Sequence, residues 1–289
     1  MAGGLVDSDR VRRREVLAET LAALDTVEQR RHYHEQAAAN LERWRAEAAG
    51  RTIDEPRVQV IAGDWGAVTS ALTRLHGVRF AVLNMANAHV PGGGYLEGAI
   101  AQEENLFRRT DCHFSLDDVH VDPGTGWYRP QMTRLLEGVD GVVYLDASRP
   151  RVCIRGEEVR TEADLGYRWL PDEEVFPFNE LRAAAQDLRG GRSFDVADAR
   201  RRIAAQLATL IRHGIGHAVL SAFGCGAFRN PAPAVAALYR EELERRIDDL
   251  ELVAFAIHAP GYGPDNLAPF VAELGRFHRN GSSSPTSGA

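Results

Sequence analysis

The pattern of apolar positions divides the chain into a helical first part and a body in which short apolar runs alternate with helical segments. Residues 6–50 contain no proline and are rich in Ala, Glu, Arg and Leu. Leu17, Leu21 and Leu24 recur at helical spacing, which predicts one or two helices with one face docked on the body. From residue 57 onward the runs become short, β-branched and continuous, as in strands that are covered on both faces.

The body carries the pattern of an α/β domain. Apolar runs predict strands at 58–61, 80–83, 142–145, 152–154, 217–223 and 252–257. Helical spacing predicts helices at 67–75, 95–109, 195–213, 231–247 and 266–277. Residues 175–188 are ambiguous, because 180–188 also suits a helix. Strands that alternate with helices imply a mixed or largely parallel central sheet with helices on both faces, which is a three-layer α/β/α architecture.

The same pattern predicts one domain rather than two. We expect an N-terminal helical extension at 1–56 that packs on the body, and a single α/β domain at 57–277. Residues 278–289 are rich in Ser, Gly and Pro, and we expect them to be a disordered tail.

Composition and charge restrict the ligands that the chain can bind. Hydrophobic residues make up 44% and charged residues 26%, which excludes disorder of the whole chain. The formal charge of −7, from 34 Lys plus Arg against 41 Asp plus Glu, argues against general binding of nucleic acid. Any anionic ligand must therefore be held locally, by backbone N–H groups or a few side chains.

The cysteines and the absence of long apolar runs indicate a cytoplasmic protein. Cys112, Cys153 and Cys225 form no CxxC pair and leave one cysteine over in any pairing, so we expect neither a disulfide scaffold nor a structural zinc site. No apolar run approaches the ~18 residues that span a bilayer, and the charged N-terminus lacks the apolar segment of a signal peptide. The histidines are scattered, and we expect no metal and no membrane contact.

Two glycine-rich loops follow predicted strands and precede predicted helices. The first contains Gly92, Gly93 and Gly94; the second runs from Gly224 to Asn230. Residues without Cβ allow positive φ and close approach of the backbone to a ligand, and the helix N-terminus favours an anion. Neither loop is a P-loop or a GxGxxG dinucleotide motif. The first loop could also be a flexible turn, and Phe228 in the second could be a core residue.

The acidic pair Glu103-Glu104 follows the first glycine loop. Adjacent helical residues point about 100° apart, so the two carboxylates cannot share one task. Such a pair is usually a solvated helix face. Here Ile100, Leu106 and Phe107 surround it, and partial burial raises a carboxyl pKa toward the range of a general acid.

Together these segments resemble a known family. Residues 82–87, the glycines at 92–94 and Gln102-Glu103-Glu104 are similar to the signature of the bacterial-type poly(ADP-ribose) glycohydrolases. That signature is three glycines followed, after six to eight residues, by Gln-Glu-Glu; here seven residues intervene, 95–101. Residues 224–228 also resemble the diphosphate-binding loop of the family. The resemblance runs from about 58 to 277, with a divergent middle at 109–190, and implies a macrodomain-like fold.

The resemblance implies a role for each residue that matches the motif. Glu104 would be the catalytic acid, Glu103 would hold ribose hydroxyls, and Gln102 would support the helix or the adjoining loop. Asn87 would bind the distal ribose, and Asn84 stands where animal members carry an aspartate.

The resemblance also implies how the loops would hold the ligand. The distal ribose and diphosphate would be wrapped by Gly92, Gly93 and Gly94. The diphosphate would be covered by Gly224, Cys225, Gly226, Ala227 and Phe228, with Phe228 packed on the ligand. Asp64 matches the acidic acceptor for adenine in macrodomains, but it also precedes a helical run and would serve equally well as its N-cap.

The function that follows is hydrolysis of ribose–ribose bonds from the ends of poly(ADP-ribose), releasing ADP-ribose. We expect a monomer that needs no cofactor and whose partner is ADP-ribose or its polymer on modified macromolecules. Two alternatives remain: a hydrolase of single ADP-ribose units on protein or nucleic acid, and a macrodomain that binds ADP-ribose without hydrolysing it.

Overall fold

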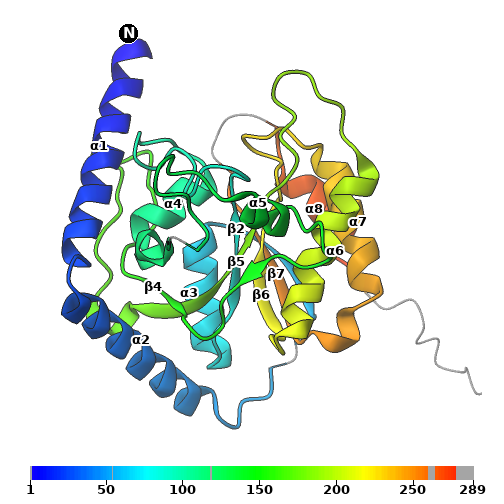
Figure 1. Ribbon diagram of the computed structural model, residues 1–289. Coiled ribbons are helices and arrows are strands. Elements are labelled where there is room, and N and C mark those ends of the chain that lie inside the picture. Colours follow the sequence, from blue (N-terminus) through cyan, green and yellow to red (C-terminus); the bar gives the residue numbers. More distant parts are fainter. Residues whose placement is uncertain (1, 54, 118, 260–263, 278–289) are drawn as a thin grey trace, which may run out of the picture.

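The computed structural model describes residues 2–53, 55–117, 119–259 and 264–277 (Figure 1). The strands are β1 (Val58–Ala62), β2 (Ala81–Met85), β3 (Tyr144–Leu145), β4 (Arg151–Cys153), β5 (Phe176–Ala183), β6 (His217–Leu220) and β7 (Leu252–Ile257). The α-helices are α1 (Ala2–Ala23), α2 (Val27–Ala48), α3 (Trp65–His76), α4 (Gln102–Arg109), α5 (Pro130–Leu136), α6 (Val196–Arg212), α7 (Ala232–Glu244) and α8 (Leu267–Leu274).

The strands form one mixed sheet in the order β1-β7-β6-β2-β5-β3. Strands β1, β7, β6, β2 and β5 are parallel, whereas β3 and β4 pair antiparallel with β5. Parallel strands align their carboxyl ends at one edge of the sheet, and the loops at that edge form the ligand-binding face of open α/β folds.

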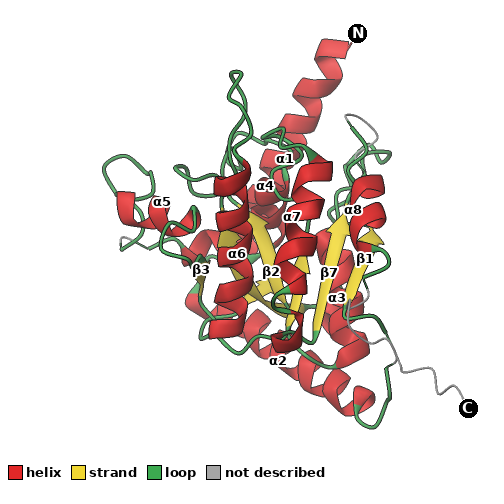
Figure 2. Cartoon of the chain, turned by 90° about the vertical axis from the view of Figure 1, so that its right-hand side faces the viewer, coloured by secondary structure: helices red, strands yellow, loops and turns green. Residues whose placement is uncertain are grey.

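Helices cover both faces of the sheet (Figure 2). Alternate residues of one strand serve the two cores: Phe255 of β7 packs in the core under α6, α7 and α8, and Ala254 packs in the core under α3 and α4. Because both faces of each central strand are buried, the apolar runs of the sequence are continuous rather than alternating. The predicted three-layer α/β fold with a mixed sheet is confirmed.

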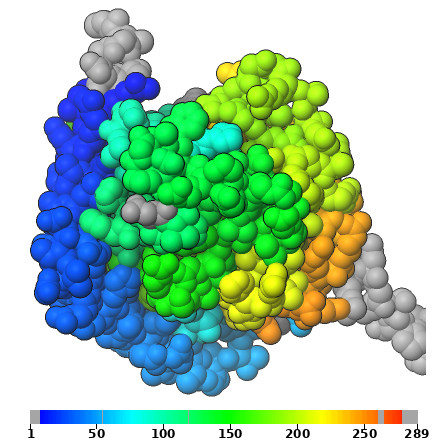
Figure 3. Space-filling model, viewed as in Figure 1, coloured from blue at the N-terminus to red at the C-terminus, as the bar shows by residue number. Residues whose placement is uncertain are grey.

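The N-terminal helices α1 and α2 lie outside the α3–α4 layer, along one side and the bottom of the molecule (Figure 1). Thr26 and Gln29 form a capping box that starts α2. Leu17 and Trp44 then enter the core shared with α3 and α4. The segment between α4 and β5 (green) covers the front of the molecule beside these helices (Figure 3). The division between extension and domain at residue 56 stays a prediction, and the predicted tail at 278–289 lies outside the described residues.

Two predicted elements are wrong. The helix expected at 95–109 begins only at Gln102, because Gly98 has a φ of +75° and packs so closely on the Arg10 carbonyl that a Cβ would lie 2.5 Å from its oxygen. The helical alternative for 180–188 is also wrong, since β5 continues to Ala183 as a strand with every residue buried. Its charged residues pair with each other there, so the sheet accommodates them.

No helix among the described residues is long and apolar enough to cross a membrane.

Candidate active site

The two glycine-rich loops lie side by side because they follow neighbouring strands. Strand β2 pairs with β6 in parallel, so the loops that leave their carboxyl ends meet at one edge of the sheet. The first loop connects β2 to α4, and the second connects β6 to α7. The sheet order therefore confirms the prediction that both loops lie at one edge of the sheet.

Helix α4 places the acidic pair at its N-terminus rather than two turns inside a longer helix. Glu103 and Glu104 occupy its first turn, and Arg108 and Arg109 occupy its last. This arrangement matches the helix dipole, which favours anions at the N-terminus and cations at the C-terminus. Glu103 is 3% exposed and Glu104 is 8% exposed, so neither belongs to a solvated helix face.

Glu103 holds the first loop. Its Oε2 accepts a hydrogen bond from the Asn87 N–H at 2.7 Å, and its Oε1 accepts one from the Gly92 N–H at 3.0 Å. Burial and the neighbouring Glu104 carboxylate raise the pKa of Glu103 well above its usual value. Because both oxygens already have donors, Glu103 positions the loop backbone in this state of the protein rather than presenting a free carboxyl.

One carboxylate oxygen of Glu104 accepts a hydrogen bond, and the other has no hydrogen-bond partner among the described residues. Its Oε1 accepts a hydrogen bond from the Gly94 N–H at 2.9 Å. Its Oε2 is buried and has no hydrogen-bond partner among the described residues. A buried polar atom without a partner costs about 1–3 kcal/mol, and such an atom in a native fold calls for an explanation. A substrate that supplies a hydrogen-bonding oxygen would satisfy it.

The glycine loop folds tightly over both carboxylates. Gly93 has a φ of +57°, and a Cβ built there would lie 2.5 Å from Oε1 of Glu104 and 3.0 Å from Oε2 of Glu103. Only glycine fits this position. The loop N–H groups were expected to face a ligand, but those of Gly92 and Gly94 bind the glutamates and that of Gly93 binds the Val90 carbonyl. Two buried carboxylates beneath the loop compete for its donors.

Two polar side chains fix the ends of this loop. Gln102 Nε2 donates to the Leu83 carbonyl at 2.8 Å, and its Oε1 accepts from the Met85 N–H at 3.0 Å, so the start of α4 is tied to β2. The Asn87 side-chain oxygen accepts from the N–H groups of His89 and Val90. Gln102 therefore supports strand β2, and the role that the resemblance implied for it, support of the helix or the adjoining loop, stays a prediction.

The second loop leaves several backbone donors unused. Within the described parts of the chain, the N–H groups of Gly226, Ala227 and Phe228 have no acceptor. Gly226 and Ala227 are exposed and Phe228 is half-buried, whereas the Cys225 side chain is buried in the core. Burial raises the pKa of its thiol to about 12, and the Cys225 N–H already donates to the Ala222 carbonyl, so Cys225 provides no free donor.

Arg189 is a residue of this site that the sequence did not indicate. Its guanidinium lies 5.0 Å from the centre of the Phe228 ring, and the Leu188 N–H donates to the Phe228 carbonyl. The Glu104 carboxylate contributes to raising the pKa of Arg189, after the bidentate contact with Asp187. Arg189 lies between β5 and α6, in the divergent middle of the chain at 109–190, where no motif marks it.

Two predicted site residues are engaged elsewhere. Asn84 is fully buried, and its Nδ2 donates to Glu180 Oε1 at 2.7 Å, so its side chain lies beneath the site. Asp64 caps α3 by accepting from the N–H groups of Gly66 and Ala67, and Arg109 donates to both of its carboxylate oxygens at 2.9 Å. The N-cap role of Asp64 is thus present, and its role as adenine acceptor stays a prediction.

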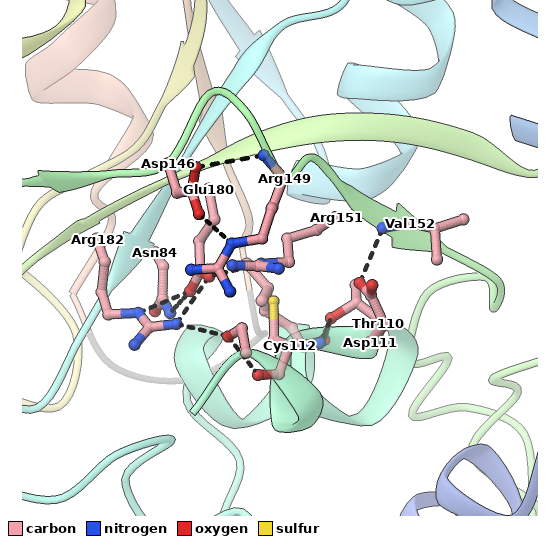
Figure 4. Close-up of polar contacts among 12 residues, drawn as sticks. Asn84, Thr110, Asp111, Cys112, Asp146, Arg149, Arg151, Val152, Glu180 and Arg182 are labelled. Carbon is pink, nitrogen blue, oxygen red and sulfur yellow. Dashed lines mark hydrogen bonds and ion pairs between the residues drawn. The ribbon is translucent and has the colours of Figure 1, made fainter. Parts of the chain in front are cut away.

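A buried ion network connects Glu180 with Arg182 and Arg151 (Figure 4). Glu180 accepts from Arg182 Nε at 2.9 Å and Nη2 at 2.8 Å, and from Arg151 Nε at 3.3 Å. These contacts hold the pKa of Glu180 near 2 in spite of burial. Arg182 also donates to the Tyr128 hydroxyl, and its charge reaches Glu103. The sequence did not indicate the network, because its three charged residues lie in the divergent middle of the chain, at 109–190.

Among the described residues, no group of three or more His, Cys, Asp or Glu side chains is arranged to hold a metal ion.

Comparison with known proteins points to one family. Residues 12–127 match the model of the microbial-type PARG catalytic domain. The structure resembles that of a poly(ADP-ribose) glycohydrolase from Thermomonospora curvata, at 24% identity and a TM-score of 0.62, over 91% of this chain and 99% of that one. It also resembles the Deinococcus radiodurans enzyme in complex with ADP-ribose, at 25% identity and a TM-score of 0.53, over 83% and 92% of the two chains. No curated protein matches.

The family match includes the first glycine loop, the acidic pair and part of the N-terminal helices, and the structural match extends over nearly the whole chain. The resemblance predicted from the sequence is confirmed: this chain has the fold of the microbial-type poly(ADP-ribose) glycohydrolases, and residues 12–127 match the model of their catalytic domain.

Proposed function

We propose that the protein is a poly(ADP-ribose) glycohydrolase that releases ADP-ribose from the ends of the polymer. The observation that carries this proposal is the Gly93 loop folded on two buried glutamates, of which one, Glu104, keeps an unpartnered oxygen. The related Thermomonospora enzyme binds the inhibitor ADP-HPD and the Deinococcus enzyme binds ADP-ribose. The ligand of this site is accordingly an ADP-ribose unit.

The chemistry requires one carboxyl group at the leaving oxygen. Cleavage of a ribose–ribose acetal passes through an oxocarbenium-like state, and a protonated carboxyl assists departure of the alkoxide. In the proposal, Glu104 protonates the leaving oxygen through Oε2 and then accepts a proton from the attacking water. Glu103 keeps Asn87 and Gly92 in place around the distal ribose. The substrate's diphosphate lies near the reacting carbon and stabilises its positive charge.

Recognition of the diphosphate is assigned to the second loop. The unused N–H groups of Gly226, Ala227 and Phe228 present donors at the sheet edge, and Arg189 adds a positive charge over the Phe228 ring. Because these few groups bind the diphosphate locally, the protein can hold an anionic ligand although its formal charge is −7. We propose that the protein acts on one terminal unit as a monomer and makes few contacts with the rest of the polymer.

Incubation with labelled poly(ADP-ribose) tests the function. We expect release of ADP-ribose as the main product, and slower turnover of peptides that carry a single ADP-ribose. Faster turnover of the mono-modified peptides would assign the protein to the mono-ADP-ribosyl hydrolases. Tight binding of ADP-ribose without hydrolysis of either substrate would make it a reader and contradict the proposal.

Replacing Gly93 with alanine is expected to lower polymer hydrolysis about 10- to 100-fold, since displacing a catalytic group by about 1 Å can cost that much. The new Cβ would collide with Oε1 of Glu104 and Oε2 of Glu103 and push the loop away from them. Initial rates of ADP-ribose release measure the effect. The matched control is Gly141→Ala, at a φ of +77° with open space around the Cβ, which carries the backbone strain without the collision. Equal activity of the two variants would show that the close approach at Gly93 is irrelevant.

A further inference from the structure

A cavity lies at the opposite edge of the sheet from the glutamates, and nothing in the proposed function uses it. Its volume is about 430 Å³, and it lies between α2 and the amino ends of β2, β5 and β6. The residues that line it and matter here are His34, Arg45, Arg79, Asn179, Gly216 and His217. A cavity of this size accommodates a small molecule of nucleotide dimensions.

Arg79 brings an uncompensated positive charge to the cavity. In the described parts of the chain it has no carboxylate partner, its Nε is buried without an acceptor, and its remaining contact is Nη2 to the Ala147 carbonyl at 3.5 Å. Burial and the charge of Arg45 lower the pKa of Arg79. Arg45 itself pairs with Glu42, and His34 pairs with Asp111. Glu42 also lines the cavity and compensates Arg45, so the charge that is left without a carboxylate partner among the described residues of this wall is that of Arg79.

Asn179 adds a polar group that is buried without a partner. The side chain is 3% exposed and lines the cavity from β5, and its Oδ1 makes no hydrogen bond with any described residue. A buried polar atom without a partner costs about 1–3 kcal/mol, and because this oxygen is an acceptor, only a ligand that brings a hydroxyl or N–H donor would satisfy it. Arg79 and Asn179 come from different elements, so two independent groups at one cavity both lack a partner.

Another cavity, lined in part by α3 and the segment 155–170, serves as a contrast. It measures about 440 Å³ and is lined by arginines, but Arg109 is paired with Asp64, Arg155 with Glu19 and Arg74 with Glu174. Its charges are balanced within the protein, so they require no ligand. The charge of Arg79 is not balanced in this way.

We propose that the cavity beneath α2 is a binding site for a phosphate-bearing small anion, held mainly by Arg79, with Arg45 on the exposed wall as a weaker contact and with Asn179 Oδ1 accepting a hydrogen bond from a hydroxyl group of the ligand. Guanidinium groups prefer phosphate oxygens, to which they donate in pairs. Pro150, Pro177 and Ile215 form an apolar part of the wall, which suits the organic portion of a phosphomonoester. Because the ligand would touch both α2 and the sheet, its binding stabilises the packing of the N-terminal helices on the body.

Thermal unfolding and calorimetric titration of the full chain with inorganic phosphate and with AMP test the proposal. We expect saturable binding and a rise in Tm that is lost in Arg79→Gln, where affinity falls about 10- to 100-fold, as for loss of a buried charged hydrogen bond. Arg45→Gln, on the exposed side of α2, weakens binding without endangering the fold, and Arg79→Lys retains part of it. Tighter binding of AMP than of phosphate identifies a phosphomonoester as the ligand, and equal binding identifies free phosphate; both support the site.

The matched control is Arg134→Gln, which removes an exposed arginine paired with Asp140 outside the cavity. This variant is expected to bind both probes like the unmodified protein. AMP that binds only at the glutamates and the glycine-rich loops would be unaffected by Arg79→Gln and Arg45→Gln, and that result would overturn the proposal. Absence of saturable binding by either probe would overturn it as well.

Discussion

Replacing Glu104 with glutamine is expected to lower kcat for poly(ADP-ribose) hydrolysis about 100- to 10,000-fold, the usual contribution of a general acid. Glutamine has nearly the shape of glutamate, and its Oε1 can still accept the hydrogen bond from the Gly94 N–H. The change therefore removes the proton that Oε2 delivers and leaves the loop in place. Single-turnover release of ADP-ribose measures the chemical step, and titration with ADP-ribose measures whether binding survives.

The control for this experiment is Glu97→Gln in the same loop. Glu97 is exposed, and its replacement makes the same change of charge without touching the buried pair. We expect its rate and its Tm to match those of the unmodified protein. If Glu104→Gln hydrolyses the polymer as fast as Glu97→Gln does, Glu104 is not the acid, and the free carboxyl oxygen has another purpose.

The sequence was sufficient to predict which segments meet at the sheet edge, because those segments are recognisable from local patterns. Two glycine-rich loops after apolar runs and an acidic pair with apolar flanks are visible along the chain, and the parallel sheet brings the loops together. The start of α4 could not be predicted, since it depends on Gly98 meeting the Arg10 carbonyl from a distant helix. The burial of Glu103 and Glu104 also exceeds what their neighbours in sequence suggest, because it too depends on contacts with segments that are distant in sequence.

The buried charges were beyond prediction for a related physical reason. Glu180 and Arg182 alternate with apolar residues in a stretch that reads equally well as helix, and only the pairing with Arg151 from β4 explains why a sheet can contain them. A charge inside a protein needs partners, and the partners here come from segments far apart in sequence. The N–H groups of Gly92 and Gly94 in the first loop likewise bind partners from a different element, since Glu103 and Glu104 belong to α4.

Replacing Glu180 with glutamine is expected to destabilise the protein by about 3–5 kcal/mol, the usual cost of breaking a buried ion pair. Arg182 and Arg151 would keep their charges but lose the carboxylate with which both are paired, although glutamine could still accept from Asn84. For a chain of this size each kcal/mol lowers Tm by roughly 2–4 °C. Thermal unfolding should therefore show a decrease of roughly 6–20 °C. The control Glu244→Gln, which breaks a surface pair with Arg240, should change stability by less than about 1 kcal/mol.

The pH dependence of this difference separates charge from packing. The folded protein holds the pKa of Glu180 near 2, below the ~4.3 of a glutamate in an unfolded chain. A lowered pKa contributes stability that is complete above the unfolded value and is lost as the pH falls toward the folded one. The gap in Tm between the unmodified protein and Glu180→Gln should stay constant from about pH 8 to pH 5 and narrow below about pH 4.5. A gap that persists unchanged in acid would mean that Glu180 stabilises the site by its shape and not by its charge.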